Sequence, residues 1–339
     1  MYKKKEILTD DIVRKVKQGN NFDFLRYLFA ISLISFHFCV LTEHSQWWFI
    51  DGSKCVKAFF VMSGFLVTYS FLRRDCDVFS YLKKRFVRIV PAYVTCILFC
   101  FVLGWFITSL STVEYLSSQK TWEYLFANIF MLNWLAPELP GTFQSNLIPV
   151  MDGSLWTMKQ EVCFYALVPF ILWLIKDRVW RNILCSFILI LCVCTYNFVN
   201  IQTQSFMYLL MGMILLLYLD VFWQWQKILI PLAILLLIPV YIIEIPIASN
   251  LCHAVESLCF PVILIGAAYK LKPLNVFRKY DNVTYGLYLY HFPVMQTLIH
   301  YGLAERNMVQ CFVITLSITL VLACASWYII EKPLIYKAG

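Results

Sequence analysis

Charged side chains are scarce in this sequence, because Asp, Glu, Lys and Arg together make up only 14% of its 339 residues. Soluble domains carry about a quarter charged residues, so this composition excludes an ordinary water-soluble protein. Hydrophobic residues make up 61% of the chain instead. The composition therefore predicts an integral membrane protein whose solvent is lipid.

The sequence also lacks the spacings of several common sites. Its five histidines lie apart, without His-x-x-x-His or Glu-x-x-His, and we therefore expect no metal site. It contains no Gly-x-Ser-x-Gly elbow and no phosphate-binding P-loop, and we expect no permanently bound cofactor. The 13 cysteines form no Cys-x-x-Cys pair and lie mostly in apolar runs, which indicates small buried side chains.

Apolar runs long enough to cross a bilayer follow one another along the chain. We expect an all-α integral membrane protein with about ten transmembrane helices in one bundle. The predicted spans are 22–42, 54–72, 88–110, 160–175, 182–199, 204–220, 228–245, 251–270, 284–302 and 309–330. The longest outward connection lies near 111–159, and its apolar stretch 122–134 is short and Trp-flanked, which suits an interface or re-entrant helix.

The cations follow the positive-inside pattern. The net charge is +8, but Lys and Arg concentrate in alternate short connections, so the excess marks cytoplasmic loops and not a nucleic-acid partner. Both termini should then be cytoplasmic. The expected parts are a segment 1–21 without a cleaved signal peptide, a membrane domain 22–335 and a tail 336–339.

Arg26 and His37 are ionisable side chains inside the first predicted span, where each is costly unless it is paired or faces water. Arg26 and His37 are eleven residues apart, which places them on one face of a helix and about 16 Å apart along its axis. We expect both to line one cavity, with Arg26 near the cytoplasmic end and His37 in the outer half. The alternatives are a snorkelling anchor and a structural histidine.

A carboxylate, Glu161, stands about one turn into the fourth predicted span. It should share the outer half of the membrane with His37. A carboxylate near an imidazole favours the charged ring and fixes its tautomer, as general-base catalysis requires. An interfacial anchor formed by Lys159 or Glu161 is the alternative.

The second span contains a small pair, Ser63 and Gly64, which lets a backbone or a ligand approach closely. Six cations then gather at one cytoplasmic mouth, among them Arg85 and Arg88. Such a cluster can clamp phosphates, although topology signals and contacts with anionic lipids account for most clusters of this kind.

In the ninth span, His291 lies about 10 Å from the cytoplasmic side and two residues before Pro293. A hydrogen-bonded core histidine and a ligand contact are equally good interpretations.

Taken in order, these segments resemble the membrane acyltransferase-3 family, which includes bacterial O-antigen and exopolysaccharide O-acetyltransferases. The matching segments are Phe24-Leu25-Arg26 followed by His37, Phe59 to Phe65, Arg85-x-x-Arg88-x-x-Pro91, Trp156-Thr157 with Glu161 and Phe164-Tyr165, Tyr285 to Pro293, and Glu331-Lys332-Pro333. They extend over nearly the whole chain.

The resemblance implies transfer of an acyl group, usually acetyl, from cytoplasmic acyl-CoA as co-substrate to a hydroxyl of a cell-surface glycan or its lipid-linked precursor. The location it implies is the bacterial inner membrane. His37 and Glu161 would be catalytic. The donor-binding residues would be Arg26, Arg85, Arg88, Ser63 and Gly64, and the candidate cavity-lining residues are Trp156, Tyr165, Tyr288 and His291.

Two residues depart from the family pattern. Lys57 stands where the resemblance places a small or acidic residue, and Lys159 enters the segment between Trp156 and Glu161. Either departure would suit an unusual acceptor or acyl group. Some members carry an added extracytoplasmic hydrolase-like domain, and this chain, which ends at Gly339, is expected to be of the stand-alone type.

A secondary transporter or flippase is the alternative function, with a proton or substrate path through Arg26, His37 and Glu161. The sequence shows no pair of inverted halves with matching interrupted helices, which argues against it. A structural membrane protein is the third class, and it would have no need of ionisable residues within its spans. The sequence identifies neither the acceptor sugar nor the oligomeric state.

Overall fold

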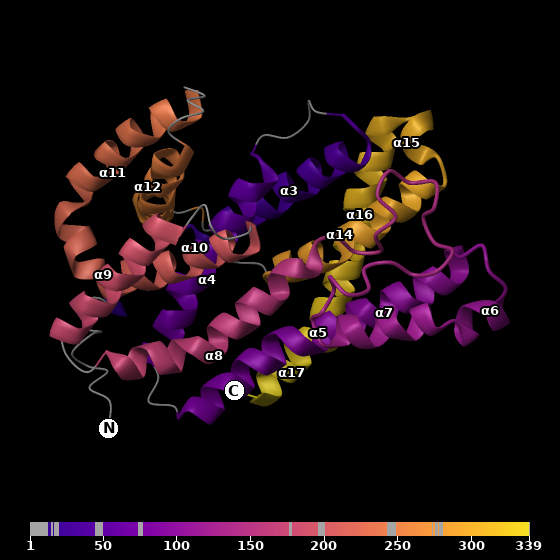
Figure 1. The fold of residues 1–339 in the computed structure, drawn as a ribbon, viewed down its shortest axis with the longest axis horizontal. Coiled ribbons are helices and arrows are strands. Elements are labelled where there is room, and N and C mark those ends of the chain that lie inside the picture. Colours follow the sequence, from indigo (N-terminus) through magenta and orange to yellow (C-terminus); the bar gives the residue numbers. More distant parts are fainter. Residues whose placement is uncertain are drawn as a thin grey trace. The chain divides into compact units, whose positions relative to one another are not determined.

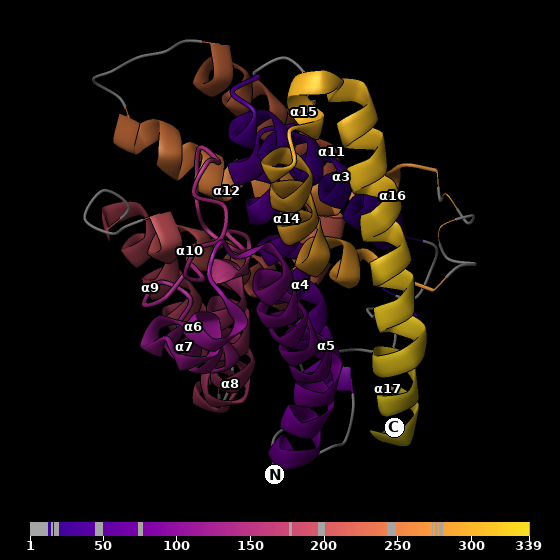
Figure 2. The same cartoon turned by 90° about the vertical axis from the view of Figure 1, so that its right-hand side faces the viewer.

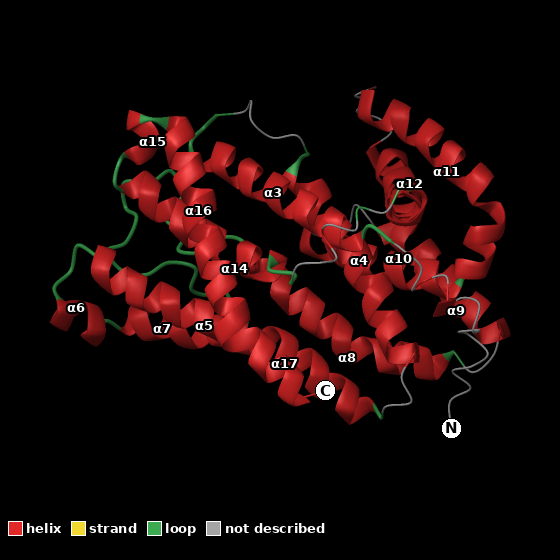
Figure 3. Cartoon of the chain, turned by 180° about the vertical axis from the view of Figure 1, so that it is seen from behind, coloured by secondary structure: helices red, strands yellow, loops and turns green. Residues whose placement is uncertain are grey.

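Helices are the regular elements of the computed structural model, which describes residues 13–14, 16, 20–44, 50–73, 77–175, 178–195, 201–242, 249–272, 274, 277 and 281–338. Within this part of the chain the structure shows no strand (Figure 3), which confirms the all-α prediction. The helices are α3 (Phe22–Leu41), α4 (Gly52–Arg73), α5 (Val78–Ile107), α6 (Thr112–Ser117), α7 (Gln119–Ile129), η1 (Leu155–Thr157), α8 (Met158–Leu174), α9 (Arg178–Thr195), α10 (Ile201–Leu217), α11 (Leu219–Ile242), α12 (Ser249–Lys270), α14 (Thr284–His300), α15 (Leu303–Arg306), α16 (Met308–Ser326), η4 (Trp327–Glu331) and α17 (Lys332–Ala338) (Figure 1).

Each of the ten predicted spans overlaps one of these helices. Six helical stretches in the described part of the chain are long and apolar enough to cross a membrane, namely those within α3, α4, α5, α11 and α12 and the one that begins with α16. The other four spans correspond to α8, α9, α10 and α14, which have 17 or 18 residues each. A membrane protein of several spans is therefore established, whereas the count of ten and the orientation of the termini stay predictions.

Helix α5 begins ten residues before the predicted span at 88. The sequence places the basic segment in a connection, because its cations indicate a cytoplasmic loop. Pro91 cannot donate a hydrogen bond to the carbonyl of Val87, but the helix continues through it, and the hydroxyl of Thr95 donates to the carbonyl of Pro91 at 2.8 Å. Arg85 and Arg88 therefore belong to a helix and not to a loop.

The chain divides into two compact units, each assembled from segments far apart in sequence. Unit 1 comprises Met1–Arg26, Val56–Val78 and Gln160–Tyr280. Unit 2 comprises Tyr27–Cys55, Phe79–Lys159 and Asp281–Gly339. Helices α3, α4 and α8 each supply residues to both units. The predicted boundaries at 22 and 335 are not tested by this division, and residues 1–12 of the predicted N-terminal segment and Gly339 of the tail lie outside the described residues.

In unit 1, α4 and α10 cross at a pair of glycines. A Cβ on Gly64 would overlap the backbone oxygen of Leu209, and a Cβ on Gly212 would overlap the backbone oxygen of Val61. Small residues at such a crossing let two backbones touch. The backbone of α10 thus fills the space beside Gly64. For this residue, the structure supports the interpretation of the small pair as a contact between helices.

In unit 2, α14 and α16 pack directly against each other. Gly302, with a left-handed φ of 71°, turns the chain between α14 and α15, a conformation that glycine adopts at little cost. A Cβ on Gly286 would lie 2.7 Å from the Cα of Ala323. Figure 2 shows α16 running on through the π-helical turn η4 into α17, so Glu331 and Lys332 stand where the helical register changes.

The connection between α5 and α8 carries α6 and α7. Helix α7 has 11 residues and extends over about 16 Å, which is too short for a span of about 30 Å. The loop after it is held by Gln296 of α14, whose amide nitrogen donates to the carbonyls of Ile148 and Val150 at 2.5 and 2.8 Å. This anchorage fixes residues 148–150 against α14.

Candidate functional site

A pair of histidines from α3 and α14 forms the first part of the candidate site. Nδ1 of His37 lies 2.7 Å from Nε2 of His291, and the planes of the two rings differ by only 2° with centroids 5.1 Å apart. His291 is fully buried, whereas His37 is half-buried. The sequence predicts both residues for the site but does not predict that they meet.

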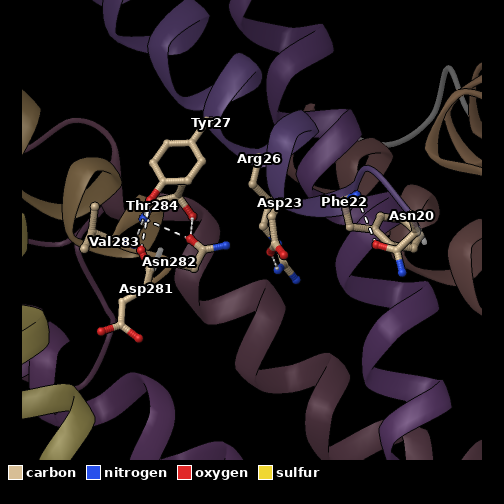
Figure 4. Close-up of polar contacts among 9 residues, drawn as sticks. All are labelled: Asn20, Phe22, Asp23, Arg26, Tyr27, Asp281, Asn282, Val283 and Thr284. Atoms are coloured by element: carbon tan, nitrogen blue, oxygen red, sulfur yellow. Dashed lines mark hydrogen bonds and ion pairs between the residues drawn. The ribbon is translucent and has the colours of Figure 1, made fainter. Parts of the chain in front are cut away.

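The contact also shows that the depths expected for these two residues cannot both hold. The sequence places His291 about 10 Å from the cytoplasmic side and His37 in the outer half, yet their rings touch. The reason is the register of the two helices. The hydroxyl of Tyr27 donates to the carbonyl of Asp281 at 3.1 Å and accepts a bond from the N–H of Val283 at 3.3 Å, so α14 begins beside the second turn of α3 (Figure 4).

Tyr288 holds the turn of α14 that precedes His291. Its hydroxyl donates to the carbonyl of Ser154 and accepts a bond from the hydroxyl of Thr157 at 2.6 Å. Gly153 lies against the ring of Phe292, where a Cβ would come within 2.7 Å. Trp156 lies in η1 between these contacts and is half-buried. The predicted cavity residues Tyr288 and Trp156 thus belong to one assembly that fixes α14 beside the two histidines.

Glu161 has its own set of partners in unit 1. Its Oε1 accepts bonds from the hydroxyl of Ser63 at 2.7 Å and from the hydroxyl of Tyr165 at 2.5 Å. Three residues that the sequence assigns to catalysis, donor binding and cavity lining therefore form one cluster. Ser63 contacts the predicted catalytic carboxylate, a role that a single sequence does not reveal. The expected pairing of Glu161 with His37 joins residues of different units and stays a prediction.

Unit 2 brings together two of the sequence motifs, Arg85-x-x-Arg88-x-x-Pro91 and Glu331-Lys332-Pro333. Glu331 is buried, accepts a bond from the hydroxyl of Ser326 at 3.0 Å and is attracted by the positive charge of Arg88. Lys332 pairs with Asp281 at 2.7 Å. Arg85 lies 5.9 Å from the ring centre of Tyr81. Arg88 is exposed, so its side chain is accessible to an anionic ligand.

Arg26, the other predicted donor-binding residue, lies in unit 1 and contacts Asp23 at 3.1 Å (Figure 4). The pair is one helical turn apart and partly exposed, with about a quarter of the Arg26 side chain accessible. Such pairs contribute little to stability. The arginine is therefore pre-oriented by a weak contact that a stronger anion can replace.

The sequence misses a second ion pair within the spans. Nζ of Lys57 on α4 lies 2.8 Å from Oε2 of Glu256 on α12, with 13% and 6% of the two side chains exposed. The hydroxyl of Tyr241 donates to the other oxygen of Glu256 at 3.0 Å. The partner of Lys57 is 199 residues away in sequence, and no local spacing signals it.

The prediction of no metal site stays a prediction, and one group of buried side chains in the structure offers metal-ligating atoms. In the described part of the chain, the sulfurs of Cys96 and Cys100 and a carboxylate oxygen of Asp152 lie within 4.8 Å of one another, and all three residues are buried. Oδ1 of Asp152 already accepts bonds from the N–H and the hydroxyl of Ser154 at 2.9 and 2.7 Å. The function proposed below assigns this group no metal.

Asp152 makes stability depend on pH. Burial raises the pKa of its carboxyl to about 7, although the Ser154 hydroxyl and N–H act in the opposite direction. The unfolded chain, with its Asp pKa near 3.9, gives up this proton more readily, so unfolding releases a proton between about pH 4 and pH 7. We expect stability to fall as pH rises through that window, by up to about 1.4 kcal/mol per pH unit.

Thermal unfolding of the purified protein at pH 5 and pH 8 tests this expectation. Asp152→Asn should lose less stability between the two values than the unchanged protein. Glu114→Gln is the control, because Glu114 is an exposed carboxyl whose pKa is lowered by its bonds with Ser111. An unchanged pH dependence in Asp152→Asn would contradict the assignment.

Comparison with known proteins places the chain among acyltransferases. The family described as an acyltransferase domain matches residues 20–329. Nodulation protein 10 of Rhizobium leguminosarum bv. viciae is 28% identical over 93% of this chain and 92% of its own length. An O-acetyl transferase of Shigella phage Sf6 is 33% identical over 44% of this chain and 45% of its own length. O-acetyltransferase OatA of Staphylococcus aureus is 21% identical over 92% of this chain and 56% of its own length. No solved structure matches the chain.

Proposed function

Since the chain belongs to the acyltransferase-3 family and is a membrane O-acetyltransferase, we propose that it transfers acetyl from cytoplasmic acetyl-CoA to a hydroxyl of a cell-surface glycan or its lipid-linked precursor. The relatives named as O-acetyltransferases support the acyl group. The proposal places the chain in the bacterial inner membrane with ten spans and both termini in the cytoplasm. The basic end of α5 then faces the compartment that supplies the donor.

The observation that carries the catalytic assignment is the histidine pair. A half-buried imidazole within a predicted span, held by a second imidazole, is a fixed proton acceptor whose side chain is still partly accessible. Sugar hydroxyls are poor nucleophiles at neutral pH, so proton removal during attack accelerates transfer. The unperturbed pKa of imidazole, near 6.5, suits this task.

In the proposed reaction, a ring nitrogen of His37 takes the proton of the acceptor hydroxyl while its oxygen bonds to the thioester carbonyl carbon. The carbon–sulfur bond then breaks, and the sulfur of CoA leaves with the proton returned by His37. The products are an acetyl ester and free CoA. Arg85 and Arg88 bind the phosphates of the donor through charge-assisted bonds.

Purified protein incubated with acetyl-CoA and glycan extracted from cells that lack the protein tests the function. We expect release of the CoA thiol together with an acetyl ester on the glycan, detected by mass spectrometry. A transporter or flippase would form no ester and release no thiol. Either absence, in protein that still binds acetyl-CoA, would exclude the transferase.

Glu161 is proposed as the second catalytic residue. We expect Glu161→Gln to lower turnover by roughly 10²-fold and to change acetyl-CoA affinity much less, because the amide keeps an acceptor oxygen and loses the charge. Ser63→Ala removes one of the two hydroxyls on Oε1, so a smaller loss of turnover should result. Ser63→Thr keeps the hydroxyl and serves as the matched control. Normal turnover in Glu161→Gln would remove the carboxylate from the mechanism.

The topology is tested by fusions. A green fluorescent protein after Gly339 should fluoresce, because it folds in the cytoplasm, and an alkaline phosphatase joined after Ser118 should be active outside the membrane. If the fusion after Gly339 does not fluoresce while the phosphatase after Ser118 is active, the number of spans is odd and the prediction of ten is wrong.

A further inference from the structure

The contact between His37 and His291 determines which ring nitrogen carries the proton in each of the two neutral imidazoles. Nδ1 of His291 lies 2.8 Å from the carbonyl of Tyr288 and 3.1 Å from that of Leu287. A backbone carbonyl only accepts hydrogen bonds, so Nδ1 of His291 carries the proton. A second proton on this ring would place a charge on a fully buried side chain, and Nε2 of His291 is therefore an acceptor.

The protonation of His291 determines which nitrogen of His37 carries a proton. Because Nε2 of His291 accepts, Nδ1 of His37 must donate across the 2.7 Å that separates them. The near-zero angle between the ring planes lets this N–H point at the lone pair of its partner. The neutral His37 ring has only one proton, so its Nε2 keeps a lone pair.

The backbone that starts this relay is itself held in place. Tyr288 provides the accepting carbonyl, and its side chain is tied to Ser154 and Thr157. Pro293 has no N–H and leaves the carbonyl of Leu289 without its helical partner, and the thiol of Cys96 donates to this carbonyl at 3.2 Å. The carbonyls of Tyr288 and Leu289, which precede His291 on α14, thus both have hydrogen-bond partners.

We infer that His291 is a positioning residue that holds His37 in the tautomer whose Nε2 accepts the proton of the acceptor hydroxyl. The inference rests on the proposed function, since it takes His37 as the base. Without a partner at Nδ1, the single proton of His37 distributes over both nitrogens, and the fraction with Nε2 protonated has no lone pair at that nitrogen to accept the proton of the acceptor hydroxyl. His291 also stabilises the charged His37 ring by keeping an acceptor at its Nδ1–H during transfer.

Nitrogen NMR of the full chain labelled with ¹⁵N-histidine in bicelles tests the tautomer directly. The protein has five histidines, and the signals missing from His37→Ala identify those of residue 37. We expect a protonated Nδ1 and a bare Nε2 on His37 in the unchanged protein. In His291→Leu both nitrogens should show averaged shifts, whereas His291→Gln, whose side-chain oxygen accepts a bond, should keep the native tautomer.

Kinetics gives the second readout. His291→Leu should lower kcat for transfer from acetyl-CoA to the extracted glycan by about 10²-fold with little change in KM for acetyl-CoA, and His291→Gln should recover most of the loss. A purely structural role would weaken donor binding as well and would not distinguish Gln from Leu. A protonated Nε2 on native His37, or a native kcat in folded His291→Leu, would overturn the inference.

The experiments distinguish a failure of the proposal that His37 is the base from a failure of the proposal that His291 positions it. The tautomer is recorded without substrate and does not depend on turnover. If the NMR result is as expected but His37→Ala still transfers acetyl, the base assignment is wrong, and the positioning role falls with it for the reaction. If His37→Ala is inactive and the native Nε2 is protonated, only the role of His291 is wrong.

Discussion

Replacing His37 by Ala is expected to lower acetyl transfer by roughly 10²- to 10⁴-fold, the range typical of general-base catalysis. The variant should still bind acetyl-CoA, since the cations proposed for donor binding are untouched. Turnover is measured as release of the CoA thiol in the presence of the glycan, and affinity by calorimetry with acetyl-CoA. Together the two measurements separate loss of chemistry from loss of the donor site.

His44→Ala is the matched control for this experiment. His44 follows the same helix, is exposed, and its Nδ1 lies 2.7 Å from the carbonyl of Thr42, so removing its imidazole should leave turnover near normal. Equal losses in the two variants would point to a general disturbance of α3. Near-normal turnover in His37→Ala would refute the proposed mechanism even though the family assignment stands.

Replacing Arg85 and Arg88 together by Ala is expected to weaken acetyl-CoA binding by about 10²-fold or more. Each charge-assisted hydrogen bond contributes roughly 1.5–3 kcal/mol, and the 3′-phosphate and diphosphate of the donor offer several acceptors. The remaining affinity should fall less steeply with added salt than the affinity of the unchanged protein. Binding to acetyl-CoA over a series of salt concentrations checks both statements.

Lysine at both positions keeps the charge but not the planar fork of donors, so this variant should bind with intermediate affinity. Lys83→Ala is the control for a general loss of charge, because Lys83 is an exposed cation on the same helix. Arg88 also faces the buried Glu331, so thermal unfolding must confirm that the double variant is folded. If the folded double variant binds acetyl-CoA with unchanged affinity, these arginines do not bind the donor and serve only as topology signals.

The helices were predictable from the sequence because hydropathy and length are local properties. Each predicted span has a helix, and the largest difference lies at the start of α5, where the cations of residues 78–87 indicated a cytoplasmic connection but belong to the helix. The meeting of α3 with α14 was not predictable. His37 and His291 are 254 residues apart, and a single sequence carries no information about which faces of distant helices touch.

For the candidate site, the residue types were likewise predictable from the sequence, whereas their contacts were not. Its residue types followed from the cost of polar groups in lipid, and His37, Glu161 and His291 were all identified in this way. Their partners depended on packing. Ser63 contacts Glu161, which is 98 residues away in sequence. The position of His291 relative to His37 could not be judged from the sequence, because it depends on the contact that sets the start of α14 beside Tyr27 of α3.

The buried pair of Lys57 and Glu256 limits how this protein can be recombined with its relatives. Lys57 departs from the family pattern, and its counter-charge stands on α12, far along the chain. A chimera that receives α4 alone from this chain would carry an ammonium group into an apolar setting without its carboxylate, a loss that typically costs several kcal/mol. Exchanges between family members should therefore move α4 and α12 together, and natural variants at position 57 should change in step with position 256.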